Sequence, residues 1–232
     1  MKKEWKGNRE SVRMALAVSK DYTNKDREPD DFYATDPKAL ESLLDHSSTF
    51  LQSLFLGIKS GYLNNYSYGE AIYKWSKLRI WECACGSGNL AEVLKERGYD
   101  VVCSDLKDRG YGRPGMLHID FLQNYDFPIR YNVGVILTNP PYSLANEFIL
   151  HALEILPDNG VYIALMNISY LAGKARYEQI YRYGSLREVY VFSSRVSCWK
   201  NNVPEKGHGS PCNYAWYVFQ KGYTGQPTLY WL

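Results

Sequence analysis

The chain has 232 residues, 45% of them hydrophobic and 22% charged, which is typical of one globular domain with a hydrophobic core. It contains no run near the roughly 20 apolar residues that a membrane span needs, and its first residues are charged, unlike a signal peptide. The five cysteines are odd in number and scattered, which argues against a secreted disulfide framework and favours the cytoplasm.

The net charge of +2 conceals an uneven distribution along the chain. Residues 1–27 carry a formal charge of +4, residues 28–160 one of −7 and residues 161–232 one of +5. Basic ends around an acidic middle suit a protein that grips a polyanion with its ends, although solvated surfaces alone also produce this pattern.

The first predicted elements are helical. Residues 1–31 are polar with alternating charges and predict an N-terminal arm, helical in part, outside the core. Asp36 followed by Pro37 predicts a helix start, with Asp at the N-cap and Pro at the first helical position. Further helical patterns lie near residues 50–58 and 68–76.

From residue 78 on, apolar strands alternate with amphipathic helices. The predicted strands are 78–83, 101–104, 133–138, 161–166, 189–192 and 214–220, with 228–231 as a candidate edge strand, and the predicted helices are 90–97, 145–156 and 174–183. This alternation predicts one α/β domain over residues 32–232, with a mostly parallel sheet covered on both faces.

A glycine loop, Cys85-Gly86-Ser87-Gly88, lies between a predicted strand and a predicted helix. Glycine permits positive φ and lets the backbone approach a ligand closely. Asp105 ends the next strand, where a carboxylate can accept hydrogen bonds from both ribose hydroxyls. The full G-x-G-x-x-G pattern is missing because residue 91 is Ala, which favours a nucleoside without phosphates over NAD.

Asp120 and Phe121 follow a third short strand in the predicted order. The carboxylate of Asp120 can accept from an adenine amine, and the ring of Phe121 can cover an adenine face. Asp120 as a turn-capping residue is the alternative.

The most informative stretch is the corner Asn139-Pro140-Pro141-Tyr142, which ends a predicted buried strand. Proline cannot donate, so the Pro140 carbonyl is left to accept from a ligand, and the Asn139 amide oxygen is a second acceptor. Two acceptors suit an –NH₂ group, with Tyr142 stacked on the ring that carries it. Accepting both hydrogens raises electron density on nitrogen as it attacks an electrophile, so stabilisation grows toward the transition state.

Three segments, Phe32-Tyr33-Ala34-Thr35-Asp36-Pro37, then Glu82-Cys83-Ala84-Cys85-Gly86-Ser87-Gly88, then Asn139-Pro140-Pro141-Tyr142, resemble in that order the amino-methyltransferases acting on DNA adenine. Among these, the chain is similar to the small phage and prophage-type adenine-N6 enzymes over most of residues 30–232. The resemblance implies a Rossmann-like class I methyltransferase fold, in which a seven-stranded, mostly parallel sheet has a C-terminal antiparallel strand. It also implies S-adenosylmethionine as the cofactor.

The same resemblance implies residue roles. The cofactor-binding set would be Tyr33, Thr35 and Pro37 around the methionine, Glu82, Cys85, Gly86 and Gly88 at the loop, Asp105 at the ribose, and Asp120 and Phe121 at the adenine. The catalytic set would be Asn139, Pro140, Pro141 and Tyr142, which would hold the N6 amine of adenine in DNA.

No stretch is long enough for a separate target-recognition domain, so the loop over residues 193–213 is the candidate substrate contact. The expected nucleic-acid contacts are Lys174, Arg176, Arg195, Trp199 and Lys200, which offer cations to phosphates and an indole to bases. The loop as a solvated hairpin is the alternative. The DNA would be single-stranded, or a duplex whose target base is flipped out.

Other functions stay open at this stage. RNA adenine, cytosine N4 and a protein glutamine each present an –NH₂ group that the same corner could hold. A binding module that keeps the fold without catalysis is a third class. We expect no metal site, because Cys198, His208 and Cys212 lack a paired C-x-x-C and a fourth ligand.

Overall fold

A computed structural model describes residues 33–60, 78–111, 116–200 and 212–232. The chain divides into two units, Met1–Asp31 and Phe32–Leu232, and the described residues all belong to the second. The predicted N-terminal arm over residues 1–31 and the predicted helix near 68–76 lie outside them. Within the described part, no helix has the length and apolar character to cross a membrane.

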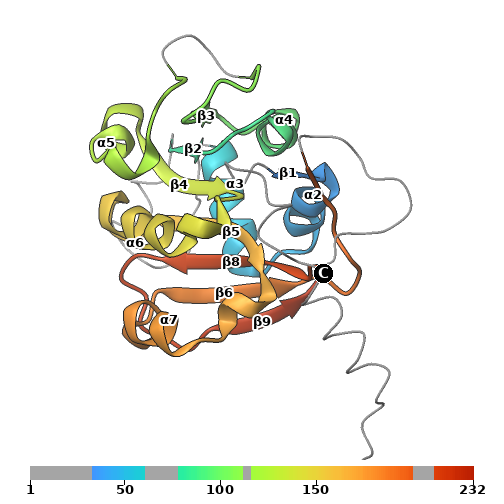
Figure 1. Ribbon diagram of the computed structural model, residues 1–232, viewed down its shortest axis with the longest axis vertical. Coiled ribbons are helices and arrows are strands. Elements are labelled where there is room, and N and C mark those ends of the chain that lie inside the picture. Colours follow the sequence, from blue (N-terminus) through green and yellow to red (C-terminus); the bar gives the residue numbers. More distant parts are fainter. Residues whose placement is uncertain (1–32, 61–77, 112–115, 201–211) are drawn as a thin grey trace, which may run out of the picture. The chain divides into compact units, whose positions relative to one another are not determined.

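The main sheet of the described residues has seven strands in the order β3-β2-β4-β5-β8-β6-β9 (Figure 1). Its strands are β2 (Arg79–Glu82), β3 (Val101–Cys103), β4 (Val133–Thr138), β5 (Val161–Asn167), β6 (Leu186–Val191), β8 (Tyr214–Gln220) and β9 (Thr228–Trp231). Neighbours are parallel except at β8, which is antiparallel to β5 and β6. The predicted fold class, mostly parallel with an antiparallel strand near the C-terminus, is confirmed.

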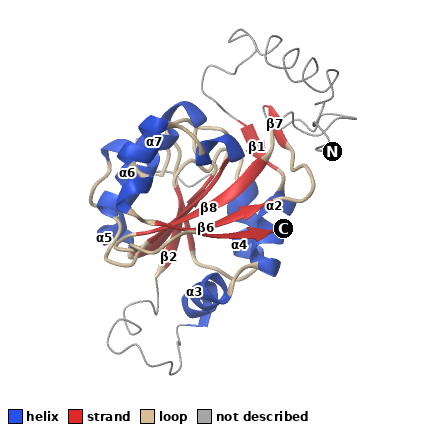
Figure 2. Ribbon diagram, turned by 90° about the horizontal axis from the view of Figure 1, so that it is seen from below, coloured by secondary structure: helices blue, strands red, loops and turns tan. Residues whose placement is uncertain are grey.

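Helices cover both faces of this sheet (Figure 2). On one face lie α2 (Pro37–His46), α3 (Thr49–Ser60) and α4 (Asn89–Glu96), and on the other α5 (Phe127–Tyr131), α6 (Ala145–Ile155) and α7 (Lys174–Gln179). In β4, Val135 and Leu137 pack under α2–α4 while Ile136 packs under α5 and α6. Because alternate side chains of a strand point to opposite faces, a strand covered on both sides is apolar throughout.

A local signal sets the start of α2 as predicted, whereas the end of α7 differs. The backbone N–H of Lys38 donates to Asp36 Oδ1 over 3.0 Å, so Asp36 caps α2 and Pro37 occupies its first turn. The predicted helix over 174–183 is shorter, because α7 ends at Gln179 and a separate 3₁₀ turn follows. The 3₁₀ turns are η2 (Phe121–Gln123), η3 (Tyr142–Leu144), η4 (Ile168–Leu171) and η5 (Tyr181–Tyr183).

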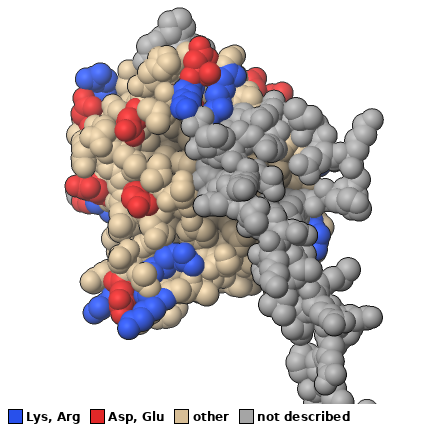
Figure 3. All heavy atoms as spheres, viewed as in Figure 1, with Lys and Arg blue, Asp and Glu red and all other residues tan. Residues whose placement is uncertain are grey.

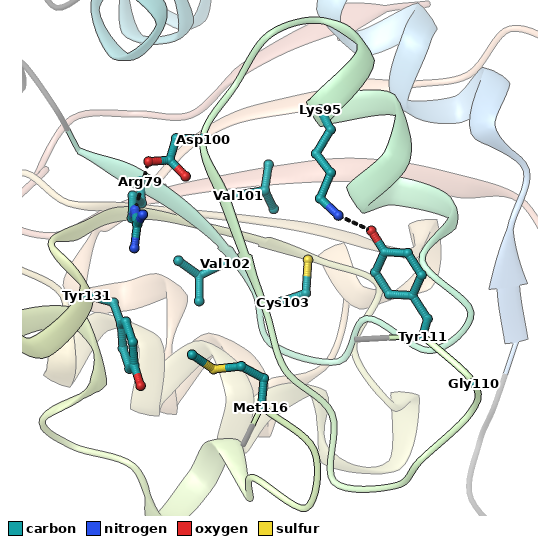
Figure 4. A pocket seen from close by; sticks show the side chains of 10 residues that line it. All are labelled: Arg79, Lys95, Asp100, Val101, Val102, Cys103, Gly110, Tyr111, Met116 and Tyr131. Atoms are coloured by element: carbon teal, nitrogen blue, oxygen red, sulfur yellow. Dashed lines mark hydrogen bonds and ion pairs between the residues drawn. The ribbon is translucent and has the colours of Figure 1, made fainter. Parts of the chain in front are cut away.

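The third short strand predicted before Asp120 is wrong for the described residues, where one isolated bridge joins Asp105 to Leu117. Asp105 Oδ1 accepts from the N–H of Lys107, and Asp108 Oδ1 accepts from that of Gly110, each over 2.8 Å. These local bonds coil the backbone and compete with an extended strand. A pocket of about 470 Å³ borders β3 here and is lined by Arg79, Lys95, Asp100, Val101, Val102, Cys103, Gly110, Tyr111, Met116 and Tyr131 (Figure 4).

The segment 193–213, predicted as a loop throughout, contains a strand. β7 (Cys198–Lys200) pairs antiparallel with β1 (Tyr33–Thr35) in a separate two-stranded sheet, with Thr35 opposite Cys198. Residues 201–211 of this segment lie outside the described part. Three residues are too few for a recognisable alternating pattern, so the pairing was invisible in the sequence.

Candidate active site

Polar side chains meet where the strands β2, β3 and β4 end. Glu82 is the last residue of β2, Asp105 follows β3 and Asn139 follows β4. Because these strands are parallel neighbours, their carboxyl ends lie at one edge of the sheet. This edge is where open α/β sheets bind ligands.

The side chain of Asn139 is held in one orientation. Its Nδ2 donates to the backbone carbonyl of Tyr33 over 3.0 Å, and only the nitrogen of the amide can do so. The opposite atom, Oδ1, is buried and has no hydrogen-bond partner within the part of the chain that the structure describes. An unpaired buried acceptor costs on the order of 1–3 kcal/mol, so such an atom calls for an explanation.

A second asparagine holds the same strand. Asn89, the first residue of α4, donates from Nδ2 to the carbonyl of Thr35 over 3.0 Å. The N–H of Asp36 donates toward Ser197 on the β7 side, so the carbonyls of Tyr33 and Thr35 point to the other edge of β1. Two long-range hydrogen bonds thus join β1 to the glycine loop and to the Asn-Pro-Pro-Tyr corner.

The backbone of the corner is fixed at two carbonyls. The Pro141 carbonyl accepts from the N–H of Leu144 over 2.9 Å, and the Tyr142 carbonyl accepts from the hydroxyl of Tyr170 over 2.5 Å. Among the described residues, no hydrogen bond reaches the carbonyl of Pro140. The corner therefore presents the two acceptors expected from the sequence, Asn139 Oδ1 and the Pro140 carbonyl, with no donor to either among the described residues.

Tyr142 packs against the core cluster under α2–α4, and its ring centroid lies 6.0 Å from that of Tyr214. Its hydroxyl is buried, and the groups next to it are the Cys198 thiol and the Tyr214 hydroxyl. Burial, followed by the neighbouring Cys198 and Tyr214, raises the pKa of this hydroxyl well above its usual value. Tyr142 is therefore a neutral phenol on the core side of the Asn-Pro-Pro-Tyr corner.

Unpaired polar atoms gather around this corner. The buried side-chain atoms without a hydrogen bond, among the described residues, are Thr35 Oγ1, Ser47 Oγ, Asn139 Oδ1, Tyr142 Oη, Asn146 Oδ1, His151 Nε2 and Tyr162 Oη. Those of Thr35, Asn139, Tyr142 and Asn146 belong to β1, the corner and the first turn of α6. Unsatisfied groups that concentrate at one place indicate a ligand site.

The glycine loop needs its glycines. Gly86 has φ +52° and Gly88 has φ +87°, a region that side-chain-bearing residues rarely adopt. The N–H of Gly86 donates to Asp105 Oδ2 over 2.8 Å, so the carboxylate braces the loop from the end of β3. With one oxygen on Gly86 and the other on Lys107, each oxygen of Asp105 keeps a second lone pair.

Glu82 is a buried carboxyl group beside this loop. Its Oε1 accepts from Thr138 Oγ1 over 2.6 Å and from the N–H of Ala84 over 3.3 Å. Burial raises the pKa of Glu82 to about 8, and the nearby Asp105 adds to the rise, against the two hydrogen bonds. A carboxyl group of this kind ionises more readily when a positively charged ligand lies beside it, so Glu82 and Asp105 together favour a cationic ligand over a phosphate.

Tyr111 was not anticipated from the sequence. A Cβ at Gly88 would lie 2.3 Å from its ring, so the phenol covers the loop directly. The Tyr111 hydroxyl donates to Glu92 and accepts from Lys95 Nζ over 2.5 Å (Figure 4), which ties the ring to α4. A tyrosine in a polar loop carries no sequence signal for this position.

The remaining predicted cofactor residues divide between loop and core. Cys85 is buried in the glycine loop, and burial raises the pKa of its thiol well above the usual range. Asp120 caps η2, its Oδ1 accepting from the N–H of Leu122 over 3.0 Å. The Phe121 ring lies in the core, 4.6 Å from that of Phe148 and 5.2 Å from that of Trp81 between centroids. Phe121 thus serves the core.

The predicted nucleic-acid contacts are spread over three elements. Lys174 is exposed at the start of α7, and Arg195 is exposed after β6. Arg176 donates to the carbonyls of Ala172 and Ser169, so its guanidinium is already bonded to backbone. Trp199 and Lys200 lie in β7, opposite residues of β1.

No protein family matches this sequence, and no curated protein matches it. Solved structures are similar in fold. One is a Listeria monocytogenes protein described as a class I S-adenosylmethionine-dependent methyltransferase, with a TM-score of 0.52 and 14% identity over 97% of this chain and 72% of that one.

Two others contain similar regions. The type IIG restriction endonuclease BpuSI matches with a TM-score of 0.53 and 15% identity over 94% of this chain and 28% of that one. The structure of the DrdV–DNA complex matches with a TM-score of 0.53 and 11% identity over 93% of this chain and 29% of that one. The chain thus spans less than a third of either, and at these identities the likeness establishes the fold, that of Rossmann-like class I methyltransferases.

Proposed function

We propose that this protein transfers a methyl group from S-adenosylmethionine to the exocyclic N6 amine of adenine in DNA. The observation that carries the proposal is the unpaired, buried Oδ1 of Asn139, which the Tyr33 carbonyl orients by holding the other end of the amide. An acceptor fixed in this way is prepared for a donor that the protein itself does not supply.

The residues at the carboxyl ends of β2 and β3 fit such a cofactor. Gly86 and Gly88 keep the loop free of side chains, and Asp105 has lone pairs left for ribose hydroxyls. Glu82 offers a carboxyl group to a cationic ligand. Tyr33, Thr35 and Pro37 would complete the methionine side from β1 and the start of α2. Bound S-adenosylmethionine would supply an electrophilic methyl group on a sulfonium centre.

The corner would activate the amine without a covalent step. Asn139 Oδ1 and the Pro140 carbonyl would accept its two hydrogens, while Pro141 holds the backbone and Tyr142 supports the base. As the nitrogen becomes tetrahedral and positive, these two hydrogen bonds strengthen, which lowers the barrier to transfer. The proton leaves to solvent once the methylated amine has formed.

DNA is the favoured substrate because two structural neighbours with TM-scores of 0.53 are a restriction endonuclease and a complex with DNA. The +5 charge of residues 161–232 supports a polyanionic partner. Incubation of the protein with methyl-labelled cofactor and separate DNA, RNA and protein substrates tests this choice. We expect the label in N6-methyladenine of DNA; label in RNA, in N4-methylcytosine or in glutamine would overturn the substrate assignment.

Cofactor binding should depend on pH through Glu82. With a pKa raised to about 8, this carboxyl is protonated in the folded protein at neutral pH. A cationic ligand favours the ionised form, so binding should release a proton, and affinity should rise by up to about ten-fold per pH unit toward pH 8. Calorimetry in buffers of different ionisation enthalpy counts that proton.

The Glu82→Gln variant should bind with no such pH dependence, whereas Glu188→Gln, at another buried glutamate, should keep it. Equal proton release by Glu82→Gln and the wild type would contradict the role of Glu82. The same raised pKa means that protonated Glu82 favours the folded state below about pH 4.5, and that this contribution is lost as pH rises toward 8.

Tyr170 should position the corner from outside the site. Its hydroxyl bonds the carbonyl of Tyr142, so Tyr170→Phe should lower kcat about ten-fold and leave cofactor affinity unchanged. Tyr181→Phe is the matched control. It removes a similar hydrogen bond, which the Tyr181 hydroxyl donates to the Tyr170 carbonyl over 2.7 Å, and this bond does not reach the corner directly. Steady-state kinetics with separate kcat and KM decides; a loss of cofactor affinity, or equal effects of both variants, would refute the positioning role.

A further inference from the structure

The carboxyl edge of the sheet is divided by charge. Glu82 and Asp105 lie at the ends of β2 and β3, where the cofactor is proposed to bind. The segments that follow β4, β5 and β6 contain no Asp or Glu over residues 139–146, 167–177 and 192–200. Lysines and arginines occur in the last two of these. One half of the edge therefore suits a cation and the other half a polyanion.

The described surface carries a second group of charges, away from this edge. Blue surface predominates at the end of the domain where Figure 1 labels α7, at lower left in Figure 3. Red surface lies mostly above it in the same view. The 3₁₀ turn η5 precedes β6, so Arg182 lies at the edge of the sheet opposite the one that carries Asn139.

Trp231 lies at the far end of the acid-free half. It is the last residue of β9, which pairs in parallel with β6, so it ends at the same edge of the sheet as Asn139. It pairs with Val191, which faces the core cluster against which Tyr170 packs, so the indole is on that face. Its side chain is 68% exposed, and a tryptophan that stays in water on a sheet edge is available for a partner.

Backbone hydrogen bonds join the segment that carries Arg195 to the end of β9. The Ser193 N–H donates to the Leu232 carbonyl over 2.7 Å, and the Leu232 N–H donates to the Val191 carbonyl over 2.8 Å. These bonds join the end of β9 to the segment that carries the exposed Arg195 two residues later. A cation on the segment that neighbours an exposed indole suits a single-stranded nucleic acid, which such proteins bind through phosphate attraction and base stacking.

The spacing matches a short stretch of nucleic acid. Four strand steps, β4 to β5, β8, β6 and β9, separate Asn139 from Trp231. At about 4.8 Å a step this is about 19 Å. With a stacked rise of about 3.4 Å, the span corresponds to about five to six nucleotides.

We propose that Trp231 stacks on a base of the substrate strand, about five to six nucleotides from the target, with Arg195 at the phosphates between them. This rests on the proposed function, since it assumes that the target base is held at Asn139. Under this proposal, single-stranded nucleic acid binds along the edge of the sheet from the Asn-Pro-Pro-Tyr corner to β9, and β9 contributes to substrate binding.

The test measures fluorescence anisotropy of a labelled single-stranded DNA of 20 nucleotides with the full chain and S-adenosylhomocysteine. Trp231→Ala should weaken binding by about five- to a hundred-fold, and Trp231→Phe should recover most of it. Tyr183→Ala is the matched control, because Tyr183 is 67% exposed but lies before β6, at the opposite edge. It should bind as the wild type does.

The outcomes separate the two claims. If the wild type binds and methylates DNA while Trp231→Ala binds equally well, or Tyr183→Ala loses as much, the Trp231 assignment alone is overturned. If the wild type binds no nucleic acid, both the assignment and the proposed function fail. Circular dichroism of each variant shows that a loss of binding is not a loss of folding.

Discussion

Asn139→Ala should reduce methyl transfer by about a hundred- to a thousand-fold while cofactor affinity stays within about two-fold of the wild type. The substitution removes Oδ1, an acceptor that no described residue satisfies, so the amine would lose a hydrogen bond that strengthens in the transition state. Single-turnover transfer to an adenine-containing oligonucleotide measures the rate, and calorimetry measures cofactor affinity.

The matched control is Asn89→Ala. Both asparagines donate one hydrogen bond of 3.0 Å to a carbonyl of β1, but Asn89 offers no acceptor at the corner. If the lower transfer rate of Asn139→Ala came only from the lost hydrogen bond to β1, the two variants would be equally slow. That result would show that the role assigned to Oδ1 is wrong. Asn139→Asp keeps an acceptor but loses the bond to Tyr33, so it should fall between Ala and the wild type.

Gly88→Val should abolish measurable cofactor binding, a loss of at least about a hundred-fold. The position has φ +87°, and its Cβ would lie 2.3 Å from Cδ2 of the Tyr111 ring. The ring is tied to Glu92 and Lys95 of α4, so it cannot yield without moving that helix. Strain and collision together should displace the loop.

Two variants separate these causes. Gly222→Ala tests φ alone, because Gly222 has φ +83° with nothing within 4 Å of its Cβ position, and should lower stability by about 1–2 kcal/mol without affecting binding. Gly88→Ala combined with Tyr111→Ala removes the collision and should bind more tightly than Gly88→Ala alone. If it binds no better, the ring is not what constrains the loop.

Signals that are local in the sequence were sufficient for most of the fold. The cap at Asp36, the apolar runs of β4 and β5, and the glycines at 86 and 88 each depend on neighbours within a few residues. Such patterns report periodicity, capping and positive φ directly. They were therefore enough to predict the parallel sheet, and they point to the edge at which we propose its ligand site.

Contacts between distant residues were not predictable in this way. The bond from Asn139 to Tyr33 spans 106 residues, and the pairing of Thr35 with Cys198 spans more. The Asn-Pro-Pro-Tyr corner indicated two acceptors, but nothing in it identified the carbonyl that orients one of them. Phe121 shows the converse: an apolar ring after a polar loop was assigned to a ligand, whereas neighbouring aromatic rings bury it in the core.

The central claim is that Asn139 Oδ1 accepts a hydrogen bond from a substrate amine that lies next to the methyl donor. A crystal structure with S-adenosylhomocysteine and an adenine-containing oligonucleotide tests it most directly. We predict that N6 of one extrahelical adenine lies about 3 Å from both Asn139 Oδ1 and the Pro140 carbonyl, facing the cofactor sulfur. An adenine bound elsewhere, or an Asn139 Oδ1 bonded to a protein donor in that complex, would contradict it.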